Sequence, residues 1–345
     1  MTAALLLLLC LQATPADREK ERIRAKAPLT EAQKAAYVSP EAPPAKPRAP
    51  YTLAVVPVEF ADRKFGATDV DKLVFGAVAD YYARASGGRF ALGGKVAPKA
   101  LLDVDRARFE RKDLEKAAAG LPAADGIAFV VAGGMVARNA PLWPHRGVVR
   151  AGEKELDYIL VPEEAPAAIL DHEFMHLLGF ADKYDDEKAS VADACILGTG
   201  YSVRRPPPPC VECRVQLGWA SAAVVDPATP SSIRLDADLT RAVRIKLTPE
   251  NDEALLLEMR DRLFIWHVGG GKKIELLGRF PTDGSDRLTP LSEPSFRGRS
   301  VGARPVWITD IRVEDGRAWF QVASDAPLTA FEEWRREKVG KRLGD

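Results

Sequence analysis

The chain has 345 residues, which is enough for roughly two domains of ~150 residues each. Hydrophobic residues make up 46% and charged residues 28%, and these values exclude a wholly disordered or fibrous chain. The 49 Lys and Arg balance the 49 Asp and Glu, whereas nucleic-acid-binding proteins normally carry a basic excess, so we expect no nucleic-acid partner. No apolar run approaches the ~20 residues of a membrane helix, so no integral membrane segment is predicted.

The first 16 residues are typical of a signal peptide. Ala3 to Leu11 is apolar and leucine-rich, which fits the hydrophobic part of a signal and is too short to cross a membrane. Small residues suited to cleavage follow at Ala13 and Ala16, although no Lys or Arg precedes the apolar run. A lipid-bearing Cys10 and a buried N-terminal helix are the alternatives. We predict a secreted or periplasmic protein.

Residues 17–50 are predicted to be a disordered linker or pro-segment. The first part is rich in charged residues. The second part contains five prolines, which oppose regular structure: Pro40, Pro43, Pro44, Pro47 and Pro50.

Between residues 51 and 225, strand patterns alternate with helix patterns. The expected strands are apolar and span residues 52–60, 90–96, 126–132 and 155–161. The expected helices span residues 70–85 and 106–119. This alternation predicts an α/β (α+β) domain with helices packed on a mixed sheet.

Residues 226–325 are predicted to form a β-rich C-terminal region. Short strand-like runs occur at 232–235, 242–247, 254–259, 263–268, 307–313 and 318–322. Asp315 and Gly316 separate the last two runs, which is a hairpin signal. Thr329 and Glu332 form a capping box, so residues 326–345 are expected to include a basic helix.

An HExxH motif identifies the candidate active site. His172 and His176 are four residues apart, so on a helix both imidazoles lie on one face and can bind one zinc ion. Glu173 lies about 100° around that helix, where it can hold the attacking water and act as the general base. Apolar residues on another face of the same segment predict that the helix packs against the core.

The residues after the motif predict a third metal ligand. Gly179 can adopt the left-handed conformation that ends a helix, which lets the chain turn back and offer an oxygen of Asp182. In the resulting pattern, HExxHxxGxxD, three protein ligands leave the fourth position open, as in catalytic zinc sites. Asp185, Asp186 and Glu187 remain rival third ligands.

Residues 172–185 read HEFMHLLGFADKYD, which is similar to the HEFGHxLGLPDxYD signature of immune inhibitor A-type secreted zinc metallopeptidases. Further similarities follow in the same order within residues 51–268, at 56–62, 80–90, 142–146, 217–219, 257–260 and 265–267. The resemblance implies a zincin-like catalytic domain related to metzincins, with an active-site helix and a single catalytic Zn²⁺.

Three residues depart from the family pattern. Met175 replaces a glycine inside the motif, and Ala181 replaces the proline before the aspartate. Residues 194–198 are similar to the methionine turn of metzincins, with Leu197 in place of the methionine. Because leucine and methionine have similar volumes, we expect an apolar floor to persist beneath the metal.

Other polar residues are weaker candidates for the site. Tyr184 or Tyr201 can donate to the oxyanion of a transition state, and His145 can contact substrate or bind metal. A structural role is the alternative for each of them. His267 lies in an apolar run and is predicted to be a core residue.

Three cysteines remain after the predicted signal peptide. Because the protein is expected to be exported, we predict a disulfide from Cys195 to Cys210 or Cys213. Three reduced, packed cysteines are the alternative. A structural zinc ribbon would need a second cysteine pair, which the sequence lacks.

The motif and its context predict an exported zinc-dependent endopeptidase that acts on protein or peptide substrates. Two alternatives stay open: a zincin-scaffold binding or adhesion protein without activity, and a zinc amidase acting on a non-protein amide. Retention of Glu173 beside both histidines disfavours a binding protein, because binding does not require a general base.

Overall fold

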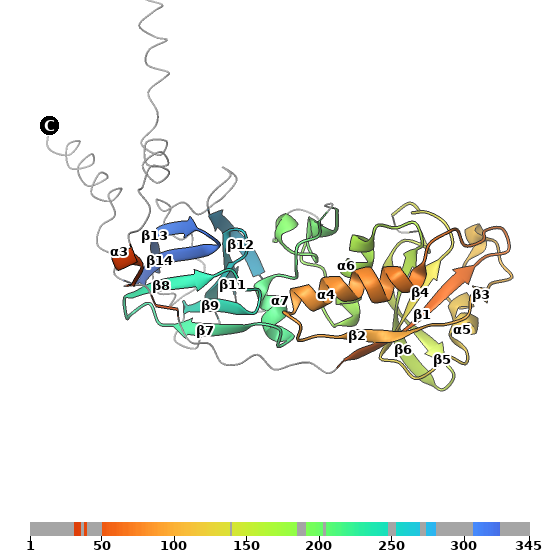
Figure 1. Ribbon diagram of the computed structural model, residues 1–345. Coiled ribbons are helices and arrows are strands. Elements are labelled where there is room, and N and C mark those ends of the chain that lie inside the picture. Colours follow the sequence, from red (N-terminus) through yellow and green to blue (C-terminus); the bar gives the residue numbers. More distant parts are fainter. Residues whose placement is uncertain are drawn as a thin grey trace, which may run out of the picture.

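The computed structural model describes residues 31–35, 38–39, 50–138, 140–184, 191–202, 205–247, 253–269, 274–280 and 306–324. These residues form a mixed α/β region followed by a strand-rich region (Figure 1). The predicted signal peptide and the predicted C-terminal basic helix lie outside the described residues. Among the described residues, no helix combines the length and hydropathy needed to cross a membrane.

The first region contains a six-stranded mixed sheet. Its strands are β1 (Tyr51–Glu59), β2 (Leu92–Val96), β3 (Ala100–Leu101), β4 (Gly126–Val131), β5 (His145–Ala151) and β6 (Lys154–Pro162). The order is β2-β1-β4-β6-β5, and β3 also pairs with β1. All pairs are parallel except β5 with β6, so β5 is an antiparallel edge strand. The near-continuous apolar runs of β1 and β4 suit strands covered on both faces.

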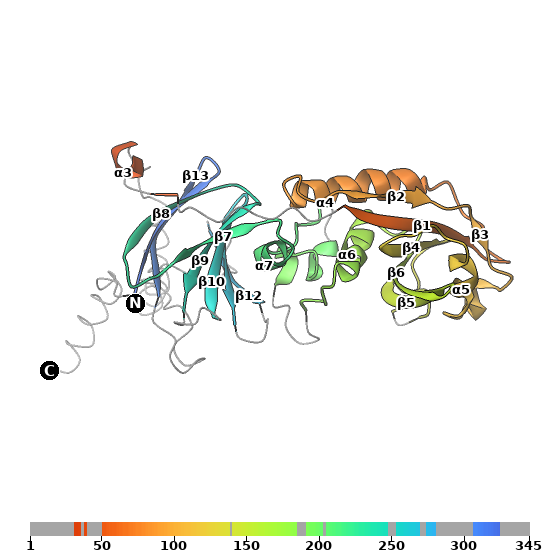
Figure 2. The same cartoon turned by 90° about the horizontal axis from the view of Figure 1, so that it is seen from below.

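Helices cover both faces of this sheet. One face contributes to a core that includes residues of η1 (Lys72–Val78), α4 (Ala79–Ala85) and α6 (Ala167–Leu177). The other face contributes to a core with residues of α5 (Asp113–Ala118). Because η1 continues directly into α4, the helix predicted for residues 70–85 is largely confirmed, and Figure 2 shows it running alongside β2.

The helix predicted over residues 106–119 is interrupted. The structure has a short 3₁₀ turn, η2 (Arg106–Arg108), and then α5. Phe109 between them has an extended backbone and is buried against Phe60, with ring centroids 5.9 Å apart. Burial of this one aromatic side chain therefore overrides the local helical pattern.

Strand β5 is absent from the sequence prediction. Its burial alternates weakly, and Arg146, Val148 and Arg150 are all exposed. An edge strand with one face in solvent contains too few apolar residues to be recognised as a strand from a continuous apolar run. This strand matters for function because it borders the candidate site.

The C-terminal region consists of two sheets. The first is five-stranded, in the order β12-β11-β10-β9-β7, and the second is three-stranded, in the order β13-β14-β8. Their bounds are β7 (Ser221–Val225), β8 (Ser231–Asp236), β9 (Arg241–Lys246), β10 (Ala254–Met259), β11 (Leu263–Val268), β12 (Ile274–Phe280), β13 (Trp307–Glu314) and β14 (Arg317–Ala323). The hairpin predicted at Asp315 and Gly316 joins β13 to β14.

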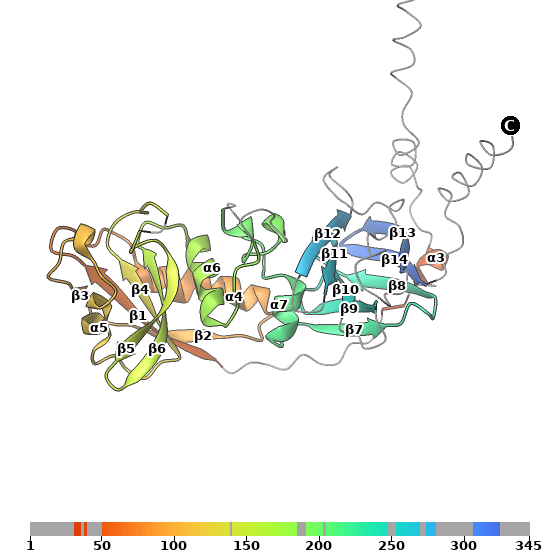
Figure 3. The same ribbon diagram turned by 180° about the vertical axis from the view of Figure 1, so that it is seen from behind.

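The predicted boundary after residue 225 is displaced. Strand β7 ends at Val225, yet it pairs in parallel with β9 and so belongs to the strand-rich region. The cores are also shared, because Trp219, Leu256 and Trp266 belong to the same apolar cluster as residues of α6. Helix α7 (Val211–Gln216) lies at this junction (Figure 3).

Part of the predicted linker has regular structure. Residues Glu31–Ala35 form the helix α3, and Val38 forms a parallel bridge with Ile233 of β8. The Val38 amide donates to the carbonyl of Ser232 at 2.9 Å. The expectation of disorder is therefore wrong for these residues, because backbone pairing at the sheet edge compensates for the low apolar content.

Candidate metal centre

Helix α6 carries the HExxH motif and is anchored by its apolar face. Phe174 is fully buried and contacts the rings of Tyr51 and Tyr82, with centroids 5.3 and 4.9 Å away. Gly179 has φ +96°, so the chain reverses after the helix as predicted. The reversal brings Asp182 back beside the two histidines.

Three donor atoms converge at this point. The Nε2 atoms of His172 and His176 are 3.2 Å apart. Asp182 Oδ1 lies 3.0 Å from His172 Nε2 and 3.5 Å from His176 Nε2. An ion with four ligands at ~2.0–2.1 Å has neighbouring donor atoms ~3.3–3.4 Å apart. The three distances therefore fit a zinc-sized tetrahedral site.

Backbone carbonyls set the tautomer of each ring. His172 Nδ1 donates to the carbonyl of Ile196 at 2.8 Å, and His176 Nδ1 donates to the carbonyl of Phe180 at 2.7 Å. Because a carbonyl only accepts, each Nδ1 carries the proton and each neutral ring directs an Nε2 lone pair toward the shared point. With both rings neutral, two lone pairs and a carboxylate repel one another at this point, and either a proton on His172 Nε2, shared with Asp182, or a metal ion offsets the repulsion.

Glu173 and Asp182 are both close enough to compete for the third ligand position. Glu173 Oε2 is 4.0 Å from His176 Nε2, whereas Asp182 Oδ1 is nearer to that atom and to His172 Nε2. One carboxylate oxygen of Glu173 and one ring nitrogen of each histidine also lie within 4.8 Å of one another, close enough to share a metal ion. Asp182 Oδ1 is the closer of the two carboxylates to His176 Nε2, which makes Asp182 the better-placed candidate for a third ligand and leaves Glu173 beside the point where the donor atoms converge.

Burial controls the protonation of Glu173. The residue is 6% exposed, and loss of hydration raises its pKa to about 7 although the charge of His172 opposes the shift. A carboxylate with a pKa near neutrality can both accept and release a proton, which is the property a general base needs.

The other three site residues are electrostatically coupled. Burial opposes ionisation of Asp182, but the hydrogen bond to His172 and the charges of both rings hold its pKa below its ordinary value. Burial also opposes protonation of His172, whose pKa is nevertheless raised by Asp182 and Ile196. For His176 burial prevails and the pKa is lowered. At neutral pH, Asp182 therefore supplies the negative charge of the donor set.

His172, His176 and Asp182 line a cleft of about 560 Å³. One wall is α6 and the segment after it, and the other wall is formed by residues 143–148, at the start of the edge strand β5. This arrangement places an unpaired strand edge beside the candidate metal position. An extended segment of another chain could add to such an edge.

The two tyrosines take different positions. Tyr184 lines the cleft, stacks over His172 with centroids 6.5 Å apart and forms a side-chain hydrogen bond with Asp182. Burial and the charge of Asp182 raise the Tyr184 pKa. The Tyr201 ring meets His172 edge-on with centroids 4.9 Å apart. The structure thus brings both predicted tyrosines to the site, with Tyr184 acting on the ligand Asp182.

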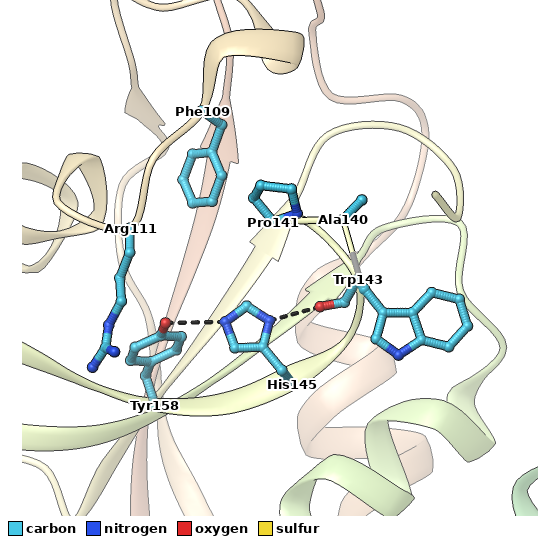
Figure 4. A pocket seen from close by; sticks show the side chains of 7 residues that line it. All are labelled: Phe109, Arg111, Ala140, Pro141, Trp143, His145 and Tyr158. Atoms are coloured by element: carbon cyan, nitrogen blue, oxygen red, sulfur yellow. Dashed lines mark hydrogen bonds between the residues drawn. The ribbon is translucent and has the colours of Figure 1, made fainter. Parts of the chain in front are cut away.

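His145 borders the cleft with both ring nitrogens engaged. Its Nδ1 lies 2.6 Å from the carbonyl of Trp143, and its Nε2 lies 3.1 Å from the hydroxyl of Tyr158 (Figure 4). With Phe109 and Arg111, these three residues also line a neighbouring hollow of about 310 Å³. His145 is therefore held as part of the wall and does not join the metal donors.

Of the remaining candidate ligands, the structure places only His267. His267 pairs with Glu253 at 2.8 Å in the strand-rich region. Asp185, Asp186 and Glu187 lie outside the described residues, so they remain untested rivals. Met175 and Leu197, two of the three departures from the family pattern, are fully buried in the core that supports α6.

The predicted disulfide is not formed. Cys195, Cys210 and Cys213 are all free and fully buried. Their sulfur atoms converge as a group of three, in which those of Cys210 and Cys213 are 3.3 Å apart. Sequence reasoning treated the cysteines in pairs and missed this arrangement, although the CxxC spacing of Cys210 and Cys213 was visible.

A scan against protein-family models found no match to this chain, and a search of curated proteins found none either.

Proposed function

We propose that the protein is an exported zinc-dependent endopeptidase with a zincin-like catalytic domain. The observation that carries the proposal is the convergence of His172 Nε2, His176 Nε2 and Asp182 Oδ1 in an open cleft, with Glu173 buried beside them. The resemblance of residues 172–185 to immune inhibitor A-type metallopeptidases supports the same function. The signal-like N-terminus supports export.

The donor set fits zinc in number, type and spacing. Two neutral imidazole nitrogens and one carboxylate oxygen form a set found in catalytic zinc sites, where an open fourth position admits water or substrate. When bound, zinc would acidify a water molecule and polarise the scissile carbonyl. His172, His176 and Asp182 would hold the ion, and the carbonyls of Ile196 and Phe180 would orient the two rings.

Glu173 performs the proton transfers in this mechanism. Its ionised carboxylate accepts a proton from the attacking water and then delivers it to the leaving amine. In the metal-free protein burial raises the pKa of Glu173 to about 7. The positive charge of a bound ion would lower this pKa and favour the ionised form that accepts the first proton. Because Glu173 lies beside the metal position, the proton is removed where the water attacks.

The shape of the cleft favours a peptide over a small compact substrate. Residues 143–148 form one wall, and β5 leaves one of its edges unpaired within the sheet. An extended peptide can add to such an edge through backbone hydrogen bonds, which position a scissile bond largely independently of side-chain sequence. Trp143 and Val148 on the same wall supply apolar contacts for substrate side chains.

The test is cleavage of a diverse peptide library by the purified protein, read by mass spectrometry with and without a chelator. We expect cleavage that the chelator abolishes and added zinc restores. Glu173→Gln should retain zinc and lose about 10²–10⁴-fold in rate. Glu115→Gln, the same change at an exposed position of α5, is the matched control and should retain the wild-type rate. Cleavage that survives both the chelator and Glu173→Gln would contradict the proposal.

A further inference from the structure

A second cluster of metal-binding side chains lies in the core behind the histidines. Cys195 follows the turn η3 (Ala192–Ala194), and Cys210 and Cys213 belong to the start of α7. All three residues are fully buried, and their sulfur atoms lie within 4.8 Å of one another. The sulfurs of Cys210 and Cys213 are 3.3 Å apart. Two segments of the chain thus bring three thiols to one buried point.

The surroundings of Cys195 stabilise a thiolate, whereas burial and the neighbouring sulfurs raise the pKa of Cys210 and Cys213 in the absence of a metal. Cys195 Sγ accepts a hydrogen bond from the backbone amide of Cys210 at 3.1 Å, and another from the amide of Leu197. Lys183 is near enough to interact electrostatically with all three sulfurs. Hydrogen bonds from backbone amides and a nearby cation both stabilise a charged sulfur in a buried position.

Three buried thiolates repel one another unless a cation lies among them. A disulfide between Cys210 and Cys213 would still leave Cys195 as a buried, amide-bonded sulfur. Four ligands around zinc at ~2.3 Å lie ~3.8 Å apart. The 3.3 Å between Cys210 and Cys213, with all three sulfurs within 4.8 Å of one another, is compatible with this spacing. Thiolates select soft metal ions, zinc among them.

We propose that Cys195, Cys210 and Cys213 bind a soft metal ion, Zn²⁺ in the first instance, at a structural site separate from the histidine centre. Among the described residues, this group contains no fourth Cys, His or carboxylate, so the fourth position would go to a small non-protein ligand. The proposal does not depend on the proposed peptidase function, because its ligands are different residues.

The position of the cluster suggests what the ion stabilises. Cys195 precedes Ile196, whose carbonyl accepts the hydrogen bond from His172 Nδ1. Lys183, which follows Asp182, donates its backbone amide to the carbonyl of Leu197 at 2.9 Å. An ion bound by all three sulfurs would join this turn to α7. The structural site would therefore hold the segment that orients the histidine and the carboxylate of the first site.

The experiment measures zinc and free thiols in the full chain, purified with a non-chelating reductant. We expect about two zinc ions per wild-type chain, because each site holds one ion. His176→Ala should retain about one zinc ion, and a thiol-specific mercurial should release it. Cys213→Ser should also retain about one zinc ion, which the mercurial should not release. These two variants separate failure of this proposal from failure of the peptidase proposal.

A second measurement on the wild-type chain covers cysteine variants that do not fold. Cobalt replacing the thiol-bound zinc should give an intense near-ultraviolet thiolate-to-metal band, which His176→Ala keeps. Three outcomes would overturn the proposal: reactive thiols at Cys195, Cys210 and Cys213 with no mercurial-released metal, a disulfide in the intact mass of native protein, or a zinc content unchanged in folded Cys213→Ser.

Discussion

The guanidinium of Arg214 in α7 and the carboxylate of Glu258 in β10 form an ion pair in which both side chains are 0% exposed. Glu258 also accepts hydrogen bonds from Arg260 at 2.7 Å and from Trp266 at 2.9 Å. Arg260 in turn donates to the carbonyl of Ala194 at 2.8 Å. One buried carboxylate therefore connects the strand-rich region to α7 and to the turn that precedes Cys195.

Glu258→Ala should lower the free energy of unfolding by about 3–5 kcal/mol, because it leaves Arg214 as an uncompensated buried charge. Urea unfolding monitored by tryptophan fluorescence measures the change. Arg317→Ala is the control, since it breaks the pair between Arg317 and Asp236, whose side chains are 53% and 35% exposed, and should cost ~0–1 kcal/mol. Equal losses in the two variants would contradict a structural role for the buried pair.

Asp182→Ala should abolish tight zinc binding at the histidine site. The reason is that Asp182 Oδ1 is near both Nε2 atoms and supplies the only ligand charge we assign there. Competition with a chromogenic chelator measures the affinity, and Asp185→Ala and Glu187→Ala serve as comparisons. If either comparison variant loses zinc while Asp182→Ala keeps it, the ligand set is wrong.

Tyr184→Phe should weaken zinc binding by ~10–100-fold, because the phenol bonds the ligand Asp182. Its kcat at saturating zinc should change little. A residue that donates to the oxyanion would instead lose kcat at every zinc concentration. Rates measured across a zinc titration distinguish the two roles, and Tyr201→Phe tested in parallel shows whether the other ring is the donor.

The buried Asp171 should make stability fall as pH rises. Its Oδ1 has no hydrogen-bond partner among the described residues, and burial raises its pKa from 3.8 to about 8, although Arg84 opposes the shift. Between those values the folded state binds the extra proton, so the free energy of unfolding of the metal-free protein decreases by up to about 1.4 kcal/mol per pH unit.

Asp171→Asn should remove this contribution because the amide does not ionise. Urea unfolding in the presence of a chelator, repeated from pH 4 to pH 8, measures the slope. Asp71→Asn, at an exposed position before η1, is the control and should keep the wild-type slope. An unchanged slope in Asp171→Asn would mean that other groups cause the pH dependence.

Local sequence patterns were sufficient for the central elements of the fold. The strands β1 and β4 have strong apolar runs, and the structure has them within a residue of their predicted bounds. The HExxH motif lies on a helix, as predicted, and this helix ends before Gly179. The interrupted helix before α5 and the edge strand β5 were not predictable in this way. Burial of Phe109 and pairing of β5 with β6 are tertiary effects that leave little trace in a short window of sequence.

The sequence by itself determined the histidine pair, since the four-residue spacing on a helix brings both rings to one face whatever surrounds them. Only the tertiary structure decided which lone pairs face the metal position, because the carbonyls of Ile196 and Phe180 are supplied by chain segments that fold back on α6. The same holds for the cysteines. The chain between residues 195 and 210 can adopt many conformations, so its sequence alone does not bring its two ends together. The packing of α7 against the core brings the three sulfurs to one point.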